Sequence, residues 1–441
     1  MRVLIIGGGI GGLATAQALT AAGVDVQVHE RHNEAADWLQ GYRIHLNRFG
    51  CRALRRCLPA PLWDAFAATA GDPGAGMSFQ THHLRELLFV EEELMTGGTG
   101  DHRAVSRIAL RRLLLAGLGA NVHFGQTFER YEVNPDGTVT AHFAGGATAT
   151  GDLLIGADGA NSRVRAQLLP HAHRVPTGAV GVAGRLALTD ETRAWLPPRI
   201  RGGLNIVLPP AGSFLFTAVF DGRTRTTEAV GDGIDLTAFG LSGQDLLDDV
   251  QDYVLWAFAA KRAGYPSDVE DLAGTALKDV VGEHIRGWHP DLRRMVTESD
   301  PEGVHAIAFK AATPVEPWPT GPVTVLGDAV HNMTPVMGLG ANTALRDAAL
   351  LAHQIKAVHR GEAGLTDAIG EYERRMLAYG FEAVNTSRSF ADRFTSGNVL
   401  ARQGMKTWLR VCSAVPPVKR SSFTDEWTDD LPAASGALVR P

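Results

Sequence analysis

The order of apolar and polar positions predicts short buried strands that alternate with helices. An apolar run from Arg2 to Ile6 ends in glycines and predicts a buried strand. We expect a helix from Gly11 to Ala22 and a second strand from Asp25 to His29. No residue from Val3 to Val24 is charged, but the glycines in that stretch weaken a membrane-spanning helix. The amino terminus is therefore predicted to be a strand–turn–helix–strand unit.

Similar patterns recur along the chain. Leucines at 110, 113, 114 and 118 fall on one face of a predicted helix from Ser106 to Leu118. Helical spacing is also predicted for residues 51–70, 246–259, 342–359 and 365–394. Further strands are expected at 121–128, 131–133, 139–143, 152–155, 204–208, 213–220 and 323–326, and residues 416–441 read as a loosely attached tail.

The composition is that of an ordinary globular protein. The chain has 441 residues, a formal net charge of -6, 45% hydrophobic and 20% charged residues. This length allows two domains, and the acidic balance argues against a general nucleic-acid binder. The three cysteines form no CxxC pair, which favours a reducing, cytoplasmic location. Since His82 and His83 are adjacent in an extended segment, no metal site is expected.

A phosphate-binding turn is predicted near the amino terminus. Gly7, Gly9 and Gly12 form a GxGxxG pattern between the first strand and helix, and Glu30 ends the second strand. In such a unit the first glycine makes the turn, the second admits a pyrophosphate and the third lets helix and strand pack closely. The acid can accept hydrogen bonds from an adenosine ribose. Together these features predict a dinucleotide site.

Two more strand ends carry a carboxylate beside a glycine. Asp158-Gly159 follows the strand at 152–155, and Gly327-Asp328 follows the strand at 323–326. Ligands bind at the carboxyl ends of parallel strands in such folds. The second junction continues through a glycine-rich turn to Asn342, where a helix amino terminus can stabilise negative charge.

These three blocks resemble those of the class A flavoprotein monooxygenases, the aromatic hydroxylases of the para-hydroxybenzoate hydroxylase type. The order and spacing of the blocks match over roughly residues 1 to 390, and the GDAxHxxxPxxGxGxN block is the most specific. The resemblance implies an α/β fold with a Rossmann-like, glutathione-reductase-type FAD domain, an inserted sheet-based substrate domain and carboxyl-terminal helices. It also implies non-covalent FAD, with NADPH or NADH as a transient electron donor.

The resemblance assigns cofactor contacts to residues of this chain. It places Gly7, Gly9 and Gly12 on the pyrophosphate and Glu30 with Arg31 at the adenosine end, and Gly11 is a further cofactor-binding residue. It implies that Arg107 contacts FAD and that Arg43 is the arginine of a mobile loop near the flavin. The remaining cofactor residues it implies are Asp158, Gly159, Gly327, Asp328, Pro335, Gly338, Gly340, Ala341 and Asn342.

The domain limits expected from this match are discontinuous. The FAD domain takes residues 1–75, 101–175 and 313–390, the substrate domain takes 76–100 and 176–312, and a helix and tail take 391–441. His45 lies in the loop where such enzymes line the substrate pocket. Phe214 and Phe216 alternate along a strand and either line a pocket for a flat substrate or form a plain core face. No general base is identified.

By this resemblance, NAD(P)H reduces FAD, O₂ adds at C4a, and the hydroperoxide hydroxylates an aromatic, polycyclic small molecule. Such reactions serve secondary-metabolite tailoring or antibiotic modification. Three alternatives stay open: a Baeyer–Villiger or epoxidising enzyme on the same scaffold, a flavin dehydrogenase, and a non-catalytic flavin-binding protein. We expect a monomer or homodimer that binds neither nucleic acid nor membrane. His331 in the third block is expected to pack or to support its neighbours, and Arg402, Lys406 and Arg410 are expected on a helix packed on the FAD domain.

Overall fold

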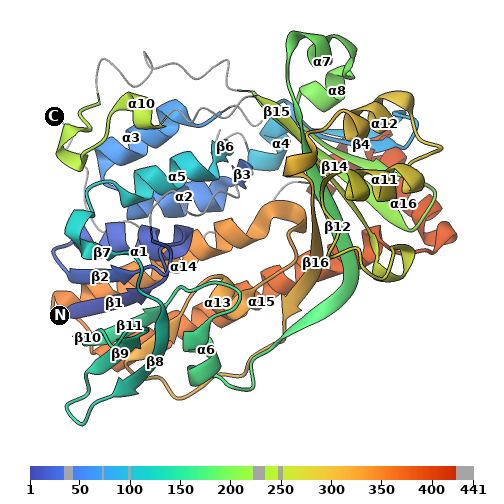
Figure 1. The fold of residues 1–441 in the computed structure, drawn as a ribbon. Helices are drawn as coiled ribbons and strands as arrows, with labels where there is room; N and C mark the ends of the chain where they lie inside the picture. The colour runs from blue at the N-terminus through green and yellow to red at the C-terminus, as the bar shows by residue number, and fades with distance from the viewer. Residues whose placement is uncertain (34–42, 72–73, 98–100, 222–233, 247–251, 424–441) are drawn as a thin grey trace.

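A parallel five-stranded sheet forms one layer of the protein (Figure 1). The computed structural model describes residues 1–33, 43–71, 74–97, 101–221, 234–246 and 252–423. The central strands have no polar face to solvent, because their residues are apolar and buried on both sides. The strand order is β17 (Val323–Val325), β11 (Leu153–Gly156), β1 (Arg2–Ile6), β2 (Asp25–His29) and β7 (Val122–His123).

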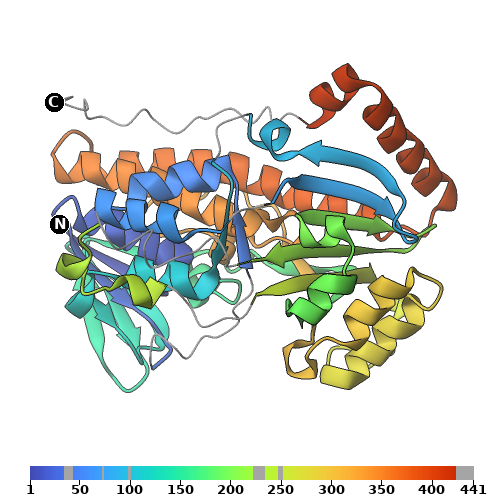
Figure 2. The same cartoon turned by 90° about the horizontal axis from the view of Figure 1, so that it is seen from above.

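Helices cover this sheet and extend away from it. The helix α1 (Ile10–Thr20) follows the glycine turn and packs on α14 (Leu339–His359), which in turn contacts α2 (Arg48–Cys57) and α15 (Leu365–Phe394). Figure 2 shows the two long helices α14 and α15 running side by side, with α15 continuing to the second sheet. The remaining helices near this layer are α3 (Ala60–Thr69), α5 (Arg107–Leu115), α6 (Arg163–Leu168), α10 (Gly243–Leu246) and α13 (Asp328–His331).

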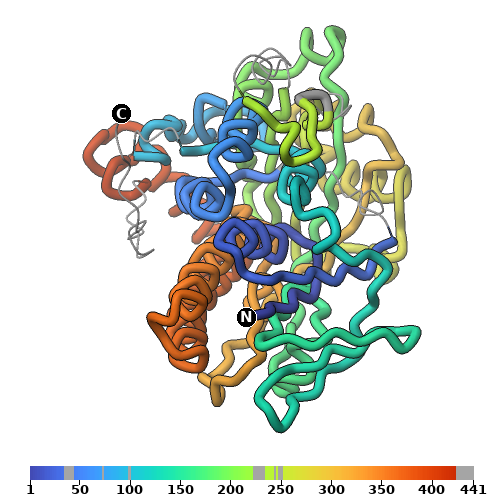
Figure 3. Tube along the Cα trace, turned by 90° about the vertical axis from the view of Figure 1, so that its left-hand side faces the viewer, coloured from blue at the N-terminus to red at the C-terminus, as the bar shows by residue number. Residues whose placement is uncertain are grey.

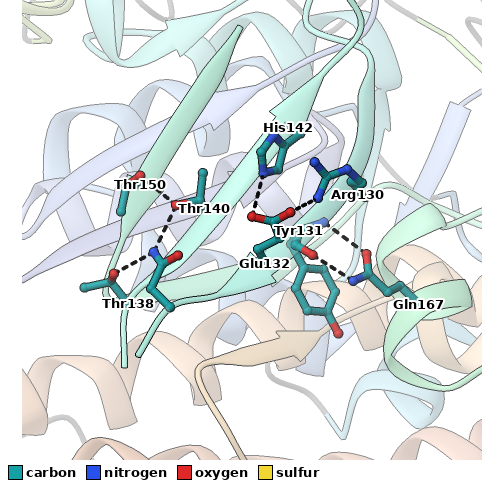
Figure 4. Close-up of polar contacts among 9 residues, drawn as sticks. Arg130, Tyr131, Glu132, Thr138, Thr140, His142, Thr150 and Gln167 are labelled. Atoms are coloured by element: carbon teal, nitrogen blue, oxygen red, sulfur yellow. Dashed lines mark hydrogen bonds and ion pairs between the residues drawn. The ribbon is translucent and has the colours of Figure 1, made fainter. Parts of the chain in front are cut away.

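A small antiparallel sheet lies beside the parallel one. It consists of β8 (Phe128–Val133), β9 (Val139–Phe143) and β10 (Thr148–Gly151). Gln167 of α6 fastens it, since its side-chain oxygen accepts from the Tyr131 amide at 3.0 Å and its amide donates to the Tyr131 carbonyl at 2.8 Å (Figure 4). The inner face of this sheet brings Phe143 onto the ring of His29, so the small sheet covers the end of β2.

The second layer is a seven-stranded sheet with one parallel pair, β13–β4. Its order is β16 (His305–Ala312), β12 (Arg174–Ala187), β15 (Tyr253–Lys261), β14 (Ser213–Phe220), β13 (Leu204–Leu208), β4 (Gly76–Thr81) and β5 (Glu86–Glu91). A two-stranded ribbon of β3 (Arg43–Leu46) and β6 (Arg103–Ser106) lies near its free face. The large sheet therefore draws strands from two distant parts of the sequence.

The two faces of the large sheet have different neighbours. One face packs on α11 (Gly274–His284) and α12 (Pro290–Thr297) and forms a closed core around Trp256 and Phe258. The other face turns toward the parallel layer. Short helices α4 (Glu92–Thr96), α7 (Asp190–Trp195) and α8 (Pro198–Arg201) border the sheet, and α16 (Val399–Ala414) and α17 (Pro416–Phe423) end the described chain.

The structure corrects several expectations. The predicted helix at 246–259 is wrong, because residues 253–261 form the central strand β15. Its apolar residues are buried on both faces, and such a run lacks the polar alternation that would have identified it. The long strand β12 was not anticipated. Residues 416–423 form a helix rather than a loose tail, and α14 starts at Leu339 instead of Asn342.

The helix with Arg402, Lys406 and Arg410 also lies elsewhere than expected. It is α16, and it packs on the edge strand β5 of the large sheet, not on the parallel layer (Figure 3). Arg402 is buried there because its guanidinium donates to the Ser213 carbonyl at 3.1 Å and to the Phe394 carbonyl. The predicted division into domains stays a prediction.

Candidate active site

A large cavity lies between the two layers. Its volume is about 1990 Å³, and its wall includes the carboxyl ends of β1, β2, β11 and β17 together with the free face of the large sheet. Single-ligand pockets usually measure about 300–1,000 Å³. The cavity therefore has room for a dinucleotide and for a second ligand beside it.

The glycine turn has the geometry that its spacing predicts. Gly7 has φ +110°, and a Cβ there would lie 2.4 Å from the carbonyl oxygen of Ala157. A Cβ on Gly12 would lie 2.2 Å from the Gly7 oxygen, whereas a Cβ on Gly9 would meet nothing within 4 Å. Gly7 and Gly12 are thus required by packing, and Gly9 leaves an open backbone facing the cavity. Packing also requires a glycine at position 11, since a Cβ on Gly11 would lie 2.7 Å from the Leu326 side chain.

Glu30 closes the turn from the end of β2. Its Oε2 accepts from the Gly8 amide at 2.7 Å, and its Oε1 accepts from the His32 amide at 3.0 Å and lies 2.6 Å from His32 Nδ1. Burial raises the pKa of this carboxyl, but the hydrogen bonds from His32 and Gly8 outweigh burial and lower the pKa overall. Glu30 is thus an ionised acid on the cavity wall, next to the exposed Arg31.

Asp158 caps the helix α6 at the edge of the cavity. Its Oδ2 accepts from the Arg163 and Val164 amides at 2.7 and 3.3 Å and so caps α6. Its buried Oδ1 has no hydrogen-bond partner among the described residues. Burial raises the pKa of this carboxyl. Asp158 and Gly159 both line the cavity.

The third block forms a rigid support behind the cavity wall. The backbone of Gly327 has φ +64°, and its amide donates to Asp347 Oδ2 at 2.7 Å. The same oxygen lies 2.6 Å from His331 Nε2, and Tyr379 donates to Asp347 Oδ1 at 2.6 Å. Burial lowers the pKa of His331, but the Asp347 carboxylate outweighs it and raises the pKa. His331 therefore supports the turn and lies outside the cavity wall.

Asp328, held by that turn, faces Arg107 across the cavity. Both residues line it, and Arg107 begins α5 behind the capping residue Ser106. Burial lowers the pKa of the Arg107 guanidinium to about 10, and the negative Asp328 opposes that shift. The pair offers a carboxylate and a cation to one ligand.

The first turn of α14 supplies amides to the same cavity. Gly338 precedes this helix with φ +64°, and Gly340, Ala341 and Asn342 occupy its first turn, where backbone amides lack intrahelical partners. The Asn342 side chain is used internally, because Nδ2 donates to the His45 carbonyl at 2.9 Å and Oδ1 accepts from the Asn47 amide at 3.0 Å. Pro335 also lines this part of the wall.

The opposite wall comes from the large sheet. It is apolar over β4, β13, β14 and β15, whereas Arg174 of β12 and Lys310 of β16 bring two charges to its other end. Phe214 and Phe216 line the cavity, whereas Leu215 between them belongs to the closed core on the other face. The register sets Phe216 beside Ala257 and Ile206, and Phe214 beside Ala259. Small residues next to the aromatic ones leave a broad, flat space. The side chains of β4, β13, β14 and β15 that line the cavity carry no charge: Met77, Phe79, Leu204, Ile206, Phe214, Phe216, Ala218, Leu255, Ala257 and Ala259.

Two imidazoles lie between these walls. His45 Nδ1 is 3.1 Å from His102 Nε2, and both residues line the cavity. Sequence reasoning missed His102, as well as Phe79, Phe390 and Phe423, because these come from separate elements that only the fold brings together. The alternation of residues 76–91 could have indicated Phe79. The backbone of Arg43 begins β3, but its side chain lies outside the described part of the structure.

The described residues contain no group of three or more His, Cys, Asp or Glu side chains arranged to hold a metal ion. Among the described helices, none combines the length and apolar character needed to cross a membrane.

Comparisons with known proteins agree with a flavin site. The family described as FAD binding domain matches residues 1–196 and 284–387. A Photorhabdus luminescens protein, provisionally assigned as an FAD-containing monooxygenase, is 34% identical; its crystal structure gives a TM-score of 0.79 over 90% of this chain and 98% of that one.

Two curated relatives extend the comparison. The dual O-methyltransferase/FAD-dependent monooxygenase elcB of Phaeosphaeria nodorum is 31% identical over 385 residues, which cover 80% of this chain and 40% of that protein. The chain thus spans less than half the length of this fungal relative. The FAD-dependent urate hydroxylase of Klebsiella pneumoniae is 28% identical over 381 residues and 85% of each chain.

The chain belongs to the FAD-binding-domain family, and within it to the class A FAD-dependent monooxygenases. Its cofactor is FAD. The predictions of family, fold class and cofactor are confirmed. The open backbone at Gly9, the unpaired Asp158 Oδ1 and the first-turn amides of α14 fit such a group.

Proposed function

We propose that this protein is an NAD(P)H- and O₂-dependent monooxygenase that hydroxylates an uncharged, polycyclic aromatic small molecule of the secondary-metabolite type. The observation that carries the proposal is the uncharged wall formed by β4, β13, β14 and β15, which shares one cavity with the dinucleotide loops. A flat apolar wall binds a flat apolar ligand through buried area and aromatic contacts.

The chain's own residues would hold the cofactor at the parallel layer. The amides of the Gly7–Gly12 turn receive the pyrophosphate, Glu30 and Arg31 receive the adenosine ribose, and Asp328 with Arg107 receives the linker to the flavin. FAD supplies reduction of O₂ and transfer of one oxygen atom when it is bound. The first-turn amides of α14 stabilise negative charge at the flavin end.

Other residues would act on the substrate. Phe214 and Phe216 bind its rings, and the apolar wall excludes water from the reacting atoms. His45, hydrogen-bonded to His102, is positioned to exchange a proton with a substrate hydroxyl. The sheet wall and the proposed cofactor loops line the same cavity, which supports a site where the substrate ring would reach the flavin.

The experiment is oxygen transfer from labelled O₂. FAD-loaded protein is supplied with NADPH or NADH and a set of neutral polycyclic phenols under ¹⁸O₂, and products are analysed by mass spectrometry and NMR. We expect a ring hydroxyl that carries one ¹⁸O atom. An oxygen inserted into a ring or added as an epoxide would instead identify a Baeyer–Villiger or epoxidising enzyme.

Two further outcomes would contradict the proposal. Reduction of FAD by the ligand itself, without NAD(P)H and with an oxidised but unoxygenated product, would identify a dehydrogenase. Absence of flavin reduction with either nicotinamide and every ligand would identify a non-catalytic flavin-binding protein.

A further inference from the structure

The last described helix, α17, returns across the edge of the large sheet. The preceding helix α16 buries Arg402, Lys406, Leu409 and Cys412 against β5. The chain then turns at Val415, and Pro416 opens α17, a position that suits proline. Figures 2 and 3 both show these red helices beside the blue strands β4 and β5.

Few contacts attach α17 to the rest of the protein. Lys419 Nζ donates to Glu91 Oε1 at 2.7 Å, at the end of β5. Val418 and Phe423 pack against the apolar cluster that also contains Phe79 and Phe394. None of the residues of α17 is fully buried. An eight-residue helix is marginal by itself, so its position depends on these side chains.

The inner side of α17 reaches the cavity. Ser422 and Phe423 line it together with Met95 of α4. The Phe423 ring centroid lies 6.0 Å from that of Phe79, which lines the sheet wall, and 5.6 Å from that of Trp408 on α16. A row of rings therefore leads from the surface of α16 into the apolar part of the cavity.

We propose that α17 forms the outer wall of the substrate chamber and that Phe423 is a specificity-determining residue for the aromatic substrate. The proposal rests on the proposed function and adds a residue that binds the substrate from a helix outside both sheets. Phe423 limits the length of the ring system that fits between Phe79 and Phe216, and it packs on the ring that does fit. The ion pair of Lys419 with Glu91 holds this wall in position.

The test is equilibrium binding by ring size. FAD-loaded full-length protein, without NAD(P)H, is titrated with 2-naphthol, 2-hydroxyanthracene and 1-hydroxypyrene, followed by quenching of flavin fluorescence. We expect Phe423→Ala to raise the Kd for 2-naphthol about twofold to tenfold. The same substitution should lower the Kd for 1-hydroxypyrene relative to the Kd for 2-naphthol. Phe423→Trp should retain the affinity for 2-naphthol and weaken the binding of 1-hydroxypyrene.

Val418→Ala is the matched control, because Val418 lies on the same helix and in the same cluster but not on the cavity wall. It should leave the order of the three Kd values unchanged. Lys419→Glu should change the three Kd values in the same direction as Phe423→Ala. Adding Glu91→Lys, which restores the ion pair, should restore the wild-type order of the Kd values. Equal ring-size dependence in Phe423→Ala and Val418→Ala, with both proteins folded by their thermal transitions, would overturn the assignment.

Binding and oxygen transfer separate the two proposals. If Phe423 selects ligands by ring size but no oxygenated product forms, the role of Phe423 is supported and the monooxygenase function is rejected. Oxygenated product with no effect of Phe423 rejects the wall alone. If the wild-type protein binds none of the three ligands, the substrate chamber is rejected, and with it both proposals.

Discussion

Single residues of the glycine turn separate packing from cofactor binding. Gly12→Ala places a Cβ 2.2 Å from the Gly7 oxygen, so we expect it to lower the free energy of unfolding by about 3 kcal/mol or more. Gly9→Ala meets open space and should cost less than about 1 kcal/mol in the protein without FAD. It should nevertheless weaken FAD binding at least tenfold, because its methyl group faces the pyrophosphate.

Urea unfolding without FAD and fluorescence titration with FAD measure the two effects. Gly282→Ala, in a helix of the other layer and also in open space, is the matched control. A Gly9→Ala protein as unstable as Gly12→Ala, or with unchanged FAD affinity, would contradict this assignment of the turn.

His29 makes folding depend on pH. Its ring lies between His123 and Phe143 at centroid distances of 5.0 and 4.4 Å, and burial, with the nearby His123, lowers its pKa to about 4. In the unfolded chain the pKa of His29 is about 6.5. Between pH 6.5 and 4 the unfolded state therefore carries more protons than the native state. Stability therefore falls as the pH is lowered through this window, by about 3 kcal/mol at most.

His29→Phe removes this titration and keeps the ring stack. Unfolding free energies of wild type and variant, measured without FAD between pH 7 and 4, should diverge, with the wild type losing more stability toward acid. Parallel curves would show that His29 is not held neutral in the native state.

At the scale of elements, Asp347 joins α14 to the turn between β17 and α13. Its carboxylate holds the Gly327 amide, His331 and Tyr379 within a fully buried site. Asp347→Ala leaves these donors unpaired, and breaking a buried pair costs about 3–5 kcal/mol. We expect that loss in urea unfolding, together with weaker FAD binding because Asp328 follows the same turn.

Asp392→Ala is the control on a neighbouring helix. Asp392 is about half exposed and pairs with Lys261 at 2.7 Å, and exposed ion pairs contribute at most about 1 kcal/mol. Equal destabilisation by the two substitutions would mean that the Asp347 network does not support the turn.

At the scale of the whole molecule, the substrate chamber is the space left between two sheets. Ala257 lies in register with Phe216 and Ala183 on the cavity face of the large sheet. Ala257→Phe fills this space, so we expect at least a tenfold loss of 2-hydroxyanthracene binding at unchanged FAD content. Ala306→Phe, which packs against the opposite face, is the control and should leave binding unchanged. Undiminished binding by Ala257→Phe would place the ligand elsewhere.

The sequence and the structure agree best where the chemistry is local. The turn at Gly7, the acid at Glu30 and the two strand-end carboxylates follow from short motifs, since each motif lies within one strand–turn–helix unit. The prediction failed at β15, where a central strand with buried apolar residues on both faces has no period that separates it from a helix.

The sequence by itself determined the family, the cofactor and the glycine turn, because these motifs need particular residues at fixed spacing. Only the tertiary structure decided which face of β14 meets the cavity, that His102 lies beside His45, and that Phe423 of α17 lines the same cavity. These contacts join residues far apart in the sequence, 57 positions for His45 and His102 and hundreds for Phe79 and Phe423, and no local spacing encodes them. In the proposed function, substrate selection depends on packing between layers, whereas cofactor binding depends on backbone geometry within one layer.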